Sequence, residues 1–240
     1  MNSFNNEKYL ILFSGGKDSF CSTLSILEKN DANIAYLVNF NNGIEIGNKV
    51  LELNFNRILN KYGEKRAKYL GTKNTVCIWR EIYRIIANEN LEDLIKEIGT
   101  NTLSQINCLI CRTSMYVISI ILCKRLDIKN IVDGARICQH FAIEQQIMLD
   151  IFKTFVASYG IDLLFPVADI TDDFEVQNRI LSYGFIPKTY ESKCLIGCKM
   201  NKELSEEQII SSKNLFKKFQ PLLIQLIEEY KNCDFNDEYS

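Results

Sequence analysis

Strand-type and helix-type segments alternate along the chain, and this alternation constrains the fold more than any other feature. Short apolar runs of strand type are separated by stretches in which apolar residues recur at helical spacing. The expected strands are residues 8–13, 33–40, 66–71, 130–133 and 161–167. The expected helices are residues 19–29, 48–62, 76–88, 91–98, 112–126, 143–159 and 172–183. We therefore expect an α/β fold with a doubly wound, mostly parallel five-stranded sheet.

A glycine turn follows the first expected strand and leads into the first expected helix. It consists of Ser14, Gly15, Gly16, Lys17, Asp18 and Ser19. Glycines let the backbone approach a ligand closely, and the N–H groups at the start of the helix attract anions. Lys17 adds a cation, while Asp18 next to phosphate would hold Mg²⁺ or cap the turn. The turn predicts a polyphosphate site.

The turn differs from a Walker A loop, which has the pattern G-x-x-x-x-G-K-[ST]. It resembles the PP-loop of the ATP pyrophosphatases, the adenine nucleotide alpha hydrolase-like superfamily. These enzymes cleave ATP between its α- and β-phosphates and use the AMP half to activate an oxygen. The resemblance implies a Rossmann-like sheet of the HUP type, with ATP and Mg²⁺ as cofactors and Lys17 and Asp18 as catalytic residues. The residues alone also allow an ordinary glycine turn with a capping serine.

The carboxyl ends of the other strands should form the walls of the same cleft, because ligands bind there in doubly wound sheets. The strand ends that we expect as walls are residues 40–43, 71–73, 133–135 and 166–169, which include Phe40 and Gly134. We expect the backbone at Gly43 or Gly134 to approach adenine and ribose, although either could be only a turn glycine. Asp169, Asp172 and Asp173 follow the last strand, where they could bind a metal or a substrate amine, or cap the next helix.

Two close cysteine pairs suggest thiol or metal chemistry. The chain has 9 cysteines and no export signal, so a disulfide framework is not expected. Cys108 and Cys111 precede an expected helix, and Cys194 and Cys198 follow the last helix–strand unit. Together they could bind zinc or an iron–sulfur cluster. Alternatively, a thiolate of lowered pKa at a helix N-terminus could carry sulfur as a persulfide, or the thiols could be inert.

Residues 107–116 and 131–139 resemble the cysteine-bearing helix start and the G-x-x-x-x-Q loop of the 4-thiouridine synthetase branch of the superfamily. This resemblance implies that Cys108 or Cys111 receives sulfur and that Gln139 lies near the nucleotide. Related tRNA thiolases place three or four cysteines on an iron–sulfur cluster. A weaker resemblance, at residues 184–194, is to the 7-cyano-7-deazaguanine synthases, which use ammonia and hold a structural zinc.

Composition limits the partners and the compartment. A net charge of −2 argues against a broad basic surface for nucleic acid, although the basic cluster at residues 61–68 could form a local patch. His140, the only histidine, could be a base, a ligand or a surface residue. The polar residues 1–6 are not a signal segment, and we expect no apolar stretch long enough to cross a bilayer. We expect a cytoplasmic protein without membrane contact.

The C-terminal residues read as helical. Residues 205–230 are amphipathic and interrupted by Pro221, which predicts one or two helices that dock on the sheet or contact a second copy in a homodimer. We divide the chain into a PP-loop domain, residues 1–204, and a helical extension, residues 205–240, packed on the same domain.

These features lead to a hypothesis of ATP-dependent sulfur transfer. We expect adenylation of a substrate oxygen, release of pyrophosphate, and thiolation of a tRNA base or a related small molecule through cysteines or a cluster. A sulfur-donor protein is a candidate partner. The alternatives are an ammonia-using amide- or nitrile-forming ligase with structural zinc, and a nucleotide- or redox-sensing module without turnover.

Overall fold

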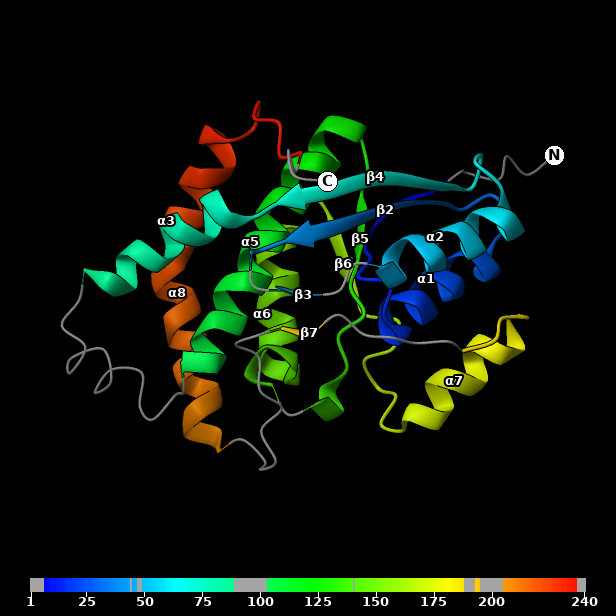
Figure 1. Ribbon diagram of the computed structural model, residues 1–240. Helices are drawn as coiled ribbons and strands as arrows, with labels where there is room; N and C mark the ends of the chain where they lie inside the picture. Colours follow the sequence, from blue (N-terminus) through cyan, green and yellow to red (C-terminus); the bar gives the residue numbers. More distant parts are fainter. Residues whose placement is uncertain are drawn as a thin grey trace.

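The computed structural model describes residues 7–43, 45–46, 49–88, 103–139, 141–187, 193–194 and 205–236. Its centre is a five-stranded sheet in which every pairing is parallel and the strand order is β4-β2-β1-β5-β6 (Figure 1). The strands are β1 Lys8–Leu12, β2 Ile34–Asn41, β4 Ala67–Asn74, β5 Asn130–Val132 and β6 Asp162–Leu164. The predicted fold class is confirmed. The sheet winds outward in both directions from β1, so the order reverses between β1 and β5.

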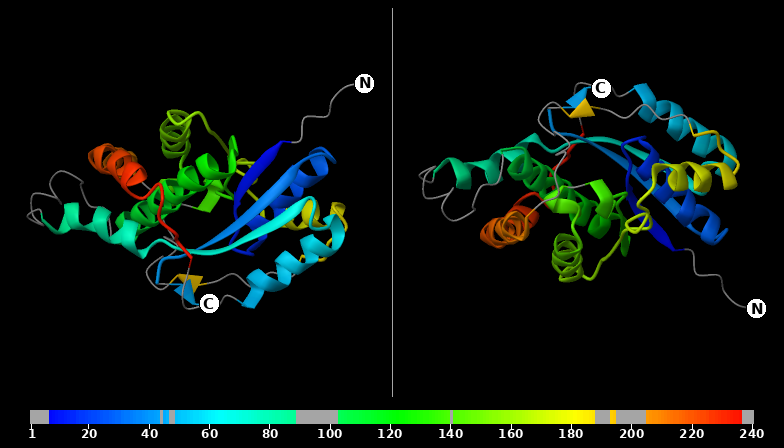
Figure 2. Two further views of the ribbon diagram at one scale, coloured as in Figure 1. Left: turned by 90° about the horizontal axis from the view of Figure 1, so that it is seen from above. Right: turned by 90° about the horizontal axis from the view of Figure 1, so that it is seen from below.

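Helices cover both faces of this sheet (Figure 2). One face packs on α1 Lys17–Lys29, α2 Lys49–Tyr62 and α7 Asp173–Ser182. The other packs on α3 Val76–Ala87, α5 Leu103–Leu126, α6 Gln146–Ala157 and α8 Glu206–Glu229. Strand β1 supplies both cores, because successive side chains of a strand point to opposite faces. Tyr9 and Ile11 enter the first core, and Leu10 and Leu12 enter the second.

Helix α5 is longer than the sequence pattern indicates. It begins at Leu103 rather than at residue 112, so both Cys108 and Cys111 lie inside the helix. The added turns keep a helical apolar spacing, and Ile106, Leu109 and Ile110 are buried in the second core. The polar residues between them hid this spacing.

The expectation that no segment is long and apolar enough to cross a bilayer is wrong by length and composition. Within α5, the residues Ser104–Leu126 pass that test with a mean hydropathy of 1.8. The window of this helix that passes is 72% buried inside the protein. A core helix passes the same test, so the finding is weak evidence for a membrane span.

Several boundaries also differ from the expected ones. Strand β6 is short because the chain turns at Pro166, which cannot donate to a sheet. Helix α8 is continuous through Pro221 and begins with a capping box formed by Ser205 and Gln208. The proline is tolerated because it lies on the exposed side of α8, where water can satisfy the carbonyl that loses its partner.

Short elements complete the fold. Two 3₁₀ turns, η1 Ile137–Gln139 and η2 Ala142–Glu144, connect β5 to α6. A small antiparallel pair, β3 Glu45–Ile46 with β7 Lys193–Cys194, was not predicted. The expected helix at residues 91–98 lies outside the described residues.

Candidate functional site

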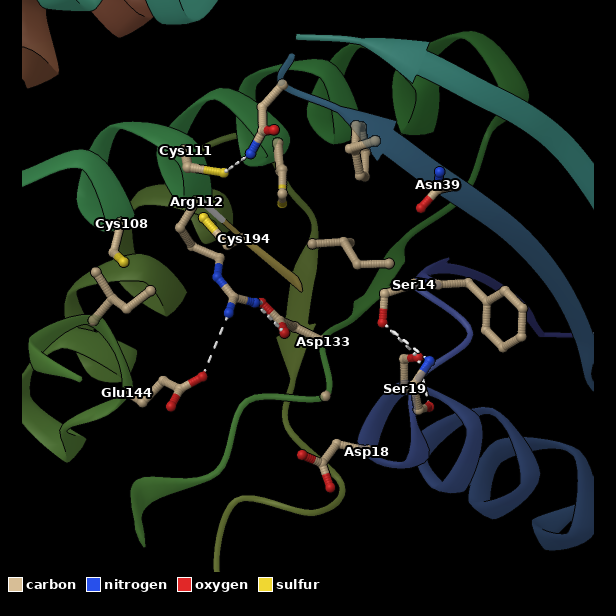
Figure 3. A pocket seen from close by; sticks show the side chains of 18 of the residues that line it. Ser14, Asp18, Ser19, Asn39, Cys108, Cys111, Arg112, Asp133, Glu144 and Cys194 are labelled. Carbon is tan, nitrogen blue, oxygen red and sulfur yellow. Dashed lines mark hydrogen bonds and ion pairs between the residues drawn. The ribbon is translucent and has the colours of Figure 1, made fainter. Parts of the chain in front are cut away.

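A cavity of about 340 Å³ opens at the carboxyl ends of β1, β2 and β5, beside the point where the strand order reverses (Figure 3). The motif at residues 14–19 lies at one end of this cavity, and the thiols lie at the other. The lining includes seven of the nine predicted nucleotide-binding residues: Ser14, Gly16, Lys17, Asp18, Ser19, Phe40 and Gly134. Three of the predicted thiols also line it: Cys108, Cys111 and Cys194.

The motif is held in a tight turn by its own hydroxyls and by α2. Ser14 Oγ accepts a hydrogen bond from the Gly16 N–H at 3.3 Å and lies 3.1 Å from Ser19 Oγ. Gly15 has a φ of +76°, and a Cβ there would lie 2.7 Å from the Leu51 Cα. Helix α1 then starts at Lys17 with no side-chain cap. Residues 16–19 line the cavity, so the start of α1 is placed where a helix N-terminus favours phosphate binding.

Gly134 joins the end of β5 to this turn. A Cβ at Gly134 would lie 2.8 Å from the Ser19 nitrogen and 2.9 Å from the Asp18 carbonyl carbon. The glycine is therefore needed for close backbone packing at the start of α1. Its contact with adenine or ribose stays a prediction, and Gly43 lies outside the cavity lining.

A chain of charges links the motif to the start of α7. Lys17 Nζ lies 2.6 Å from Asp173 Oδ2, and this contact holds the pKa of Asp173 at about 2. Arg136, only 2% exposed, pairs with both Asp18, at 3.2 Å, and Asp173. Asp172 caps α7, as one of the two interpretations of the sequence had it. Arg136 was not predicted as a site residue, because nothing in the local pattern shows that this arginine is buried.

A second charged group lies between the motif and the thiols. Arg112 binds both carboxylate oxygens of Asp133 at 2.5 Å, and Tyr116 donates to Asp133 at 2.6 Å. The contact between the same arginine and Glu144 Oε1 is longer, at 3.5 Å. Burial raises the pKa of Glu144 to about 7, although the charge of Arg112 works in the opposite direction. Asp133 belongs to a strand end that was expected to form a wall of the cleft, and it does line the cavity, whereas Glu144 was not predicted as a site residue.

The thiols have a different environment from the one expected. Burial, with Cys111 and Cys194 adding to it, raises the pKa of Cys108 to about 12. The expectation of a pKa lowered by a helix N-terminus is wrong for Cys108, because it lies in the interior of α5. Asn42, at the end of β2, donates a hydrogen bond to Cys111 Sγ at 3.0 Å. Asn42 belongs to a strand end that was expected to form a wall of the cleft, but its contact with the thiol was not predicted.

The predicted metal site stays untested as a whole. Among the residues that the structure describes, no group of three His, Cys, Asp or Glu side chains is placed to hold a metal ion. Cys198 and His140 lie outside the described residues. Gln139 ends η1, but its side chain is also outside the description.

Comparison with known proteins agrees with this architecture. Residues 4–148 match the model of a family described as thiamine biosynthesis protein (ThiI). A 4-thiouridine synthetase, solved in complex with RNA and bound ATP, superposes with a TM-score of 0.61 at 16% identity over 95% of this chain. The alignment covers 54% of the synthetase, so this chain spans about half of its length.

A second solved structure has the same core. The U34-tRNA thiolase NcsA from Methanococcus maripaludis, with its 4Fe-4S cluster, gives a TM-score of 0.51 at 17% identity and covers 97% of this chain and 75% of its own. At such identities the likeness shows the fold. No curated protein sequence matches the chain significantly. The family match and the fold together confirm the resemblance to the PP-loop ATP pyrophosphatases.

Proposed function

Because the chain belongs to the family of thiamine biosynthesis proteins (ThiI), we propose that it is an ATP-dependent enzyme that adenylates a carbonyl oxygen of a tRNA base and replaces it with sulfur. One observation carries the proposal: the PP-loop, residues 14–19, and the thiols of Cys108 and Cys111 line the same cavity. We place the α-phosphate of a nucleotide bound at the loop on the side of the thiols. The RNA and ATP bound to the synthetase, and the substrate named for NcsA, support tRNA as the substrate class.

The first step uses the motif end of the cavity. The backbone N–H groups at the start of α1 bind the β- and γ-phosphates, and Lys17 exchanges its partner Asp173 for phosphate. The substrate oxygen attacks the α-phosphorus, an O–P bond forms, and pyrophosphate leaves. The carboxylate of Asp18 and the hydroxyl of Ser19 fit Mg²⁺, which would neutralise the charge of the leaving pyrophosphate. Positioning and charge neutralisation supply most of the rate.

The second step uses the thiol end. The terminal sulfur of a persulfide on Cys108 or Cys111 attacks the activated carbon, and AMP leaves. The other cysteine then attacks the sulfur that remains attached to the protein. The thiolated base leaves and a Cys108–Cys111 disulfide forms, which a low-molecular-weight thiol reduces for the next cycle. A persulfide-carrying donor protein would supply the sulfur.

Metal chemistry is a separate question. The three thiols that line the cavity have the chemistry that an iron–sulfur cluster or zinc requires, but the described side chains do not form a metal-binding group. We therefore route no step through a metal at the thiols. Iron, sulfide and zinc analysis of protein purified without oxygen tests this choice: iron with sulfide would indicate a cluster, and zinc alone would favour the ammonia-using ligase.

Turnover assays test the proposed function. Purified protein is incubated with ATP, Mg²⁺, unmodified tRNA transcript and a persulfide donor; AMP, pyrophosphate and thiolated nucleosides are then measured. We expect Asp18→Asn to abolish AMP formation and Cys111→Ser to keep it while losing the thiolated nucleoside. Cys233→Ser, at an exposed C-terminal position, is the matched control and should behave as wild type. An aminated product that requires ammonium would instead identify the ligase.

A further inference from the structure

Glu144 is a buried acid that the reaction described above does not use. It ends η2, is 6% exposed and lines the cavity. Its Oε2 is buried and has no hydrogen-bond partner among the described residues. A buried carboxyl oxygen without a partner is costly, so its retention at a cavity wall calls for a ligand that supplies a donor.

The neighbours of Glu144 do not satisfy it. Arg112 is the nearest cation, but its short contacts go to Asp133, and it stays 3.5 Å from Glu144 Oε1. That distance is well beyond the roughly 2.7–2.9 Å of a strong charged hydrogen bond. Tyr116 also donates to Asp133. Two carboxylates thus share one arginine, and only Asp133 is fully bonded.

More distant charges also act on Glu144. Asp18, from the start of α1, and Asp133 disfavour its negative charge, whereas Arg136, from the loop after β5, favours it. Burial is the largest influence and raises the pKa of Glu144 to about 7. A group with such a pKa accepts and returns protons readily near neutral pH.

Hydrogen bonds fix the position of Glu144 on the thiol side of the motif (Figure 3). The Glu144 N–H donates to the Phe141 carbonyl at 3.0 Å, and the Ala142 N–H donates to Gln105 Oε1, from α5, at 2.9 Å. The 3₁₀ turn that carries Glu144 is therefore tied to α5. A proton acceptor placed in this way is held rigidly at the cavity wall.

We propose that Glu144 binds the ring N–H adjacent to the carbonyl oxygen that is adenylated and takes its proton during that step. The inference rests on the proposed function. A neutral cyclic amide is a weak oxygen nucleophile; as its N–H proton moves to the Glu144 carboxylate, the electron pair shifts through nitrogen and carbon to oxygen. The oxygen then bonds to the α-phosphorus, the bond to pyrophosphate breaks, and no oxidant or reductant is needed. This role of Glu144 requires that the substrate is a base with a ring N–H next to its carbonyl group.

Binding of nucleosides tests recognition without turnover. With α,β-methylene-ATP filling the nucleotide half, affinities are measured for uridine and guanosine and for their N3-methyl and N1-methyl counterparts. We expect at least one N–H nucleoside to bind about tenfold or more tighter than its methylated form, because a site built for a donor rejects analogues that lack it. Glu144→Met, which keeps the volume but removes the acceptor, should erase this preference. Glu175→Gln, an exposed acid on α7, is the matched control.

Turnover then separates recognition from proton transfer. Glu144→Gln keeps an acceptor oxygen but cannot take a proton, so we expect retained nucleoside preference with AMP formation slowed about 100-fold or more. The rise of the wild-type rate with pH near 7 should also disappear. A fall in stability alone, with the nucleoside preference and the pH profile unchanged, would make Glu144 a structural partner of Arg112 and overturn the proposal.

The two proposals fail in different ways. Absence of any preference for N–H nucleosides in the wild-type protein would refute the role of Glu144 whatever the turnover assay shows. A preference that depends on Glu144, together with AMP formation but no thiolated product, would leave this role standing and refute the sulfur-transfer step.

Discussion

Replacement of Gly134 by alanine tests the close packing between β5 and the PP-loop. The φ of Gly134 lies outside the left-handed region, so alanine meets no backbone strain there and the effect is steric. The new Cβ would lie 2.8 Å from the Ser19 nitrogen, whereas ordinary contact begins at 3.4 Å, so the loop must move by about 0.6 Å. Overpacking of this kind costs roughly 1–3 kcal/mol. In a chain of this length that corresponds to a loss of roughly 2–12 °C in Tm.

Nucleotide binding should suffer together with stability. The displaced atoms belong to the turn that would surround the phosphates, and a shift of this size should weaken ATP binding about tenfold. Thermal unfolding and isothermal calorimetry measure the two effects. Gly160→Ala is the matched control: Gly160 has a φ of +71° and open space around it, at the opposite end of the sheet. It should lower Tm through backbone strain and leave ATP affinity intact. Wild-type Tm and ATP affinity in Gly134→Ala would refute the packing argument.

Three further predictions concern stability. Hydrogen bonds from Lys17 and Arg136 lower the pKa of Asp173 from 3.8 to about 2. The stability that the ionised Asp173 contributes is therefore present above pH 3.8 and is lost as the pH falls toward 2. Asp173→Asn should remove this part of the acid-induced fall in Tm, and the part is worth under ~1 kcal/mol because Asp173 is half-exposed. Phe152 is fully buried between two aromatic rings, and Phe152→Ala should cost about 3–5 kcal/mol in urea unfolding. The pKa of Glu144 is raised from 4.5 to about 7, so the free energy of unfolding should fall as the pH rises from 4.5 to 7. Glu144→Met should make this dependence on pH weaker. The same dependence in the variant and the wild type would contradict the prediction.

The sheet was predictable because its signals are local. Apolar runs such as residues 8–13 and 33–40 show their strand character within a few residues, and the helices between them show a period of 3.6. The start of α5 was not predictable in this way. Its first turns mix polar residues with Ile106 and Leu109, and only the core that buries these two side chains shows that the helix extends so far.

The residues of the candidate site were predictable only where they are close together in the sequence. The PP-loop is contiguous, so its residues and their affinity for phosphate could be inferred from the sequence and from the resemblance it carries. Arg136 and Glu144 come from separate segments and follow no pattern. Their importance depends on burial and on which charges face them, and both are properties of the packed chain.

The sequence by itself determined the class of fold, the phosphate-binding turn and the presence of paired thiols, because each depends on residues close together in the chain. Only the tertiary structure decided that Cys108 is a buried thiol of raised pKa rather than a thiolate at a helix end, and that Glu144 and Asp133 compete for Arg112. The physical reason is that desolvation and the attraction between charges depend on distance and burial in space, which packing of the strand ends creates.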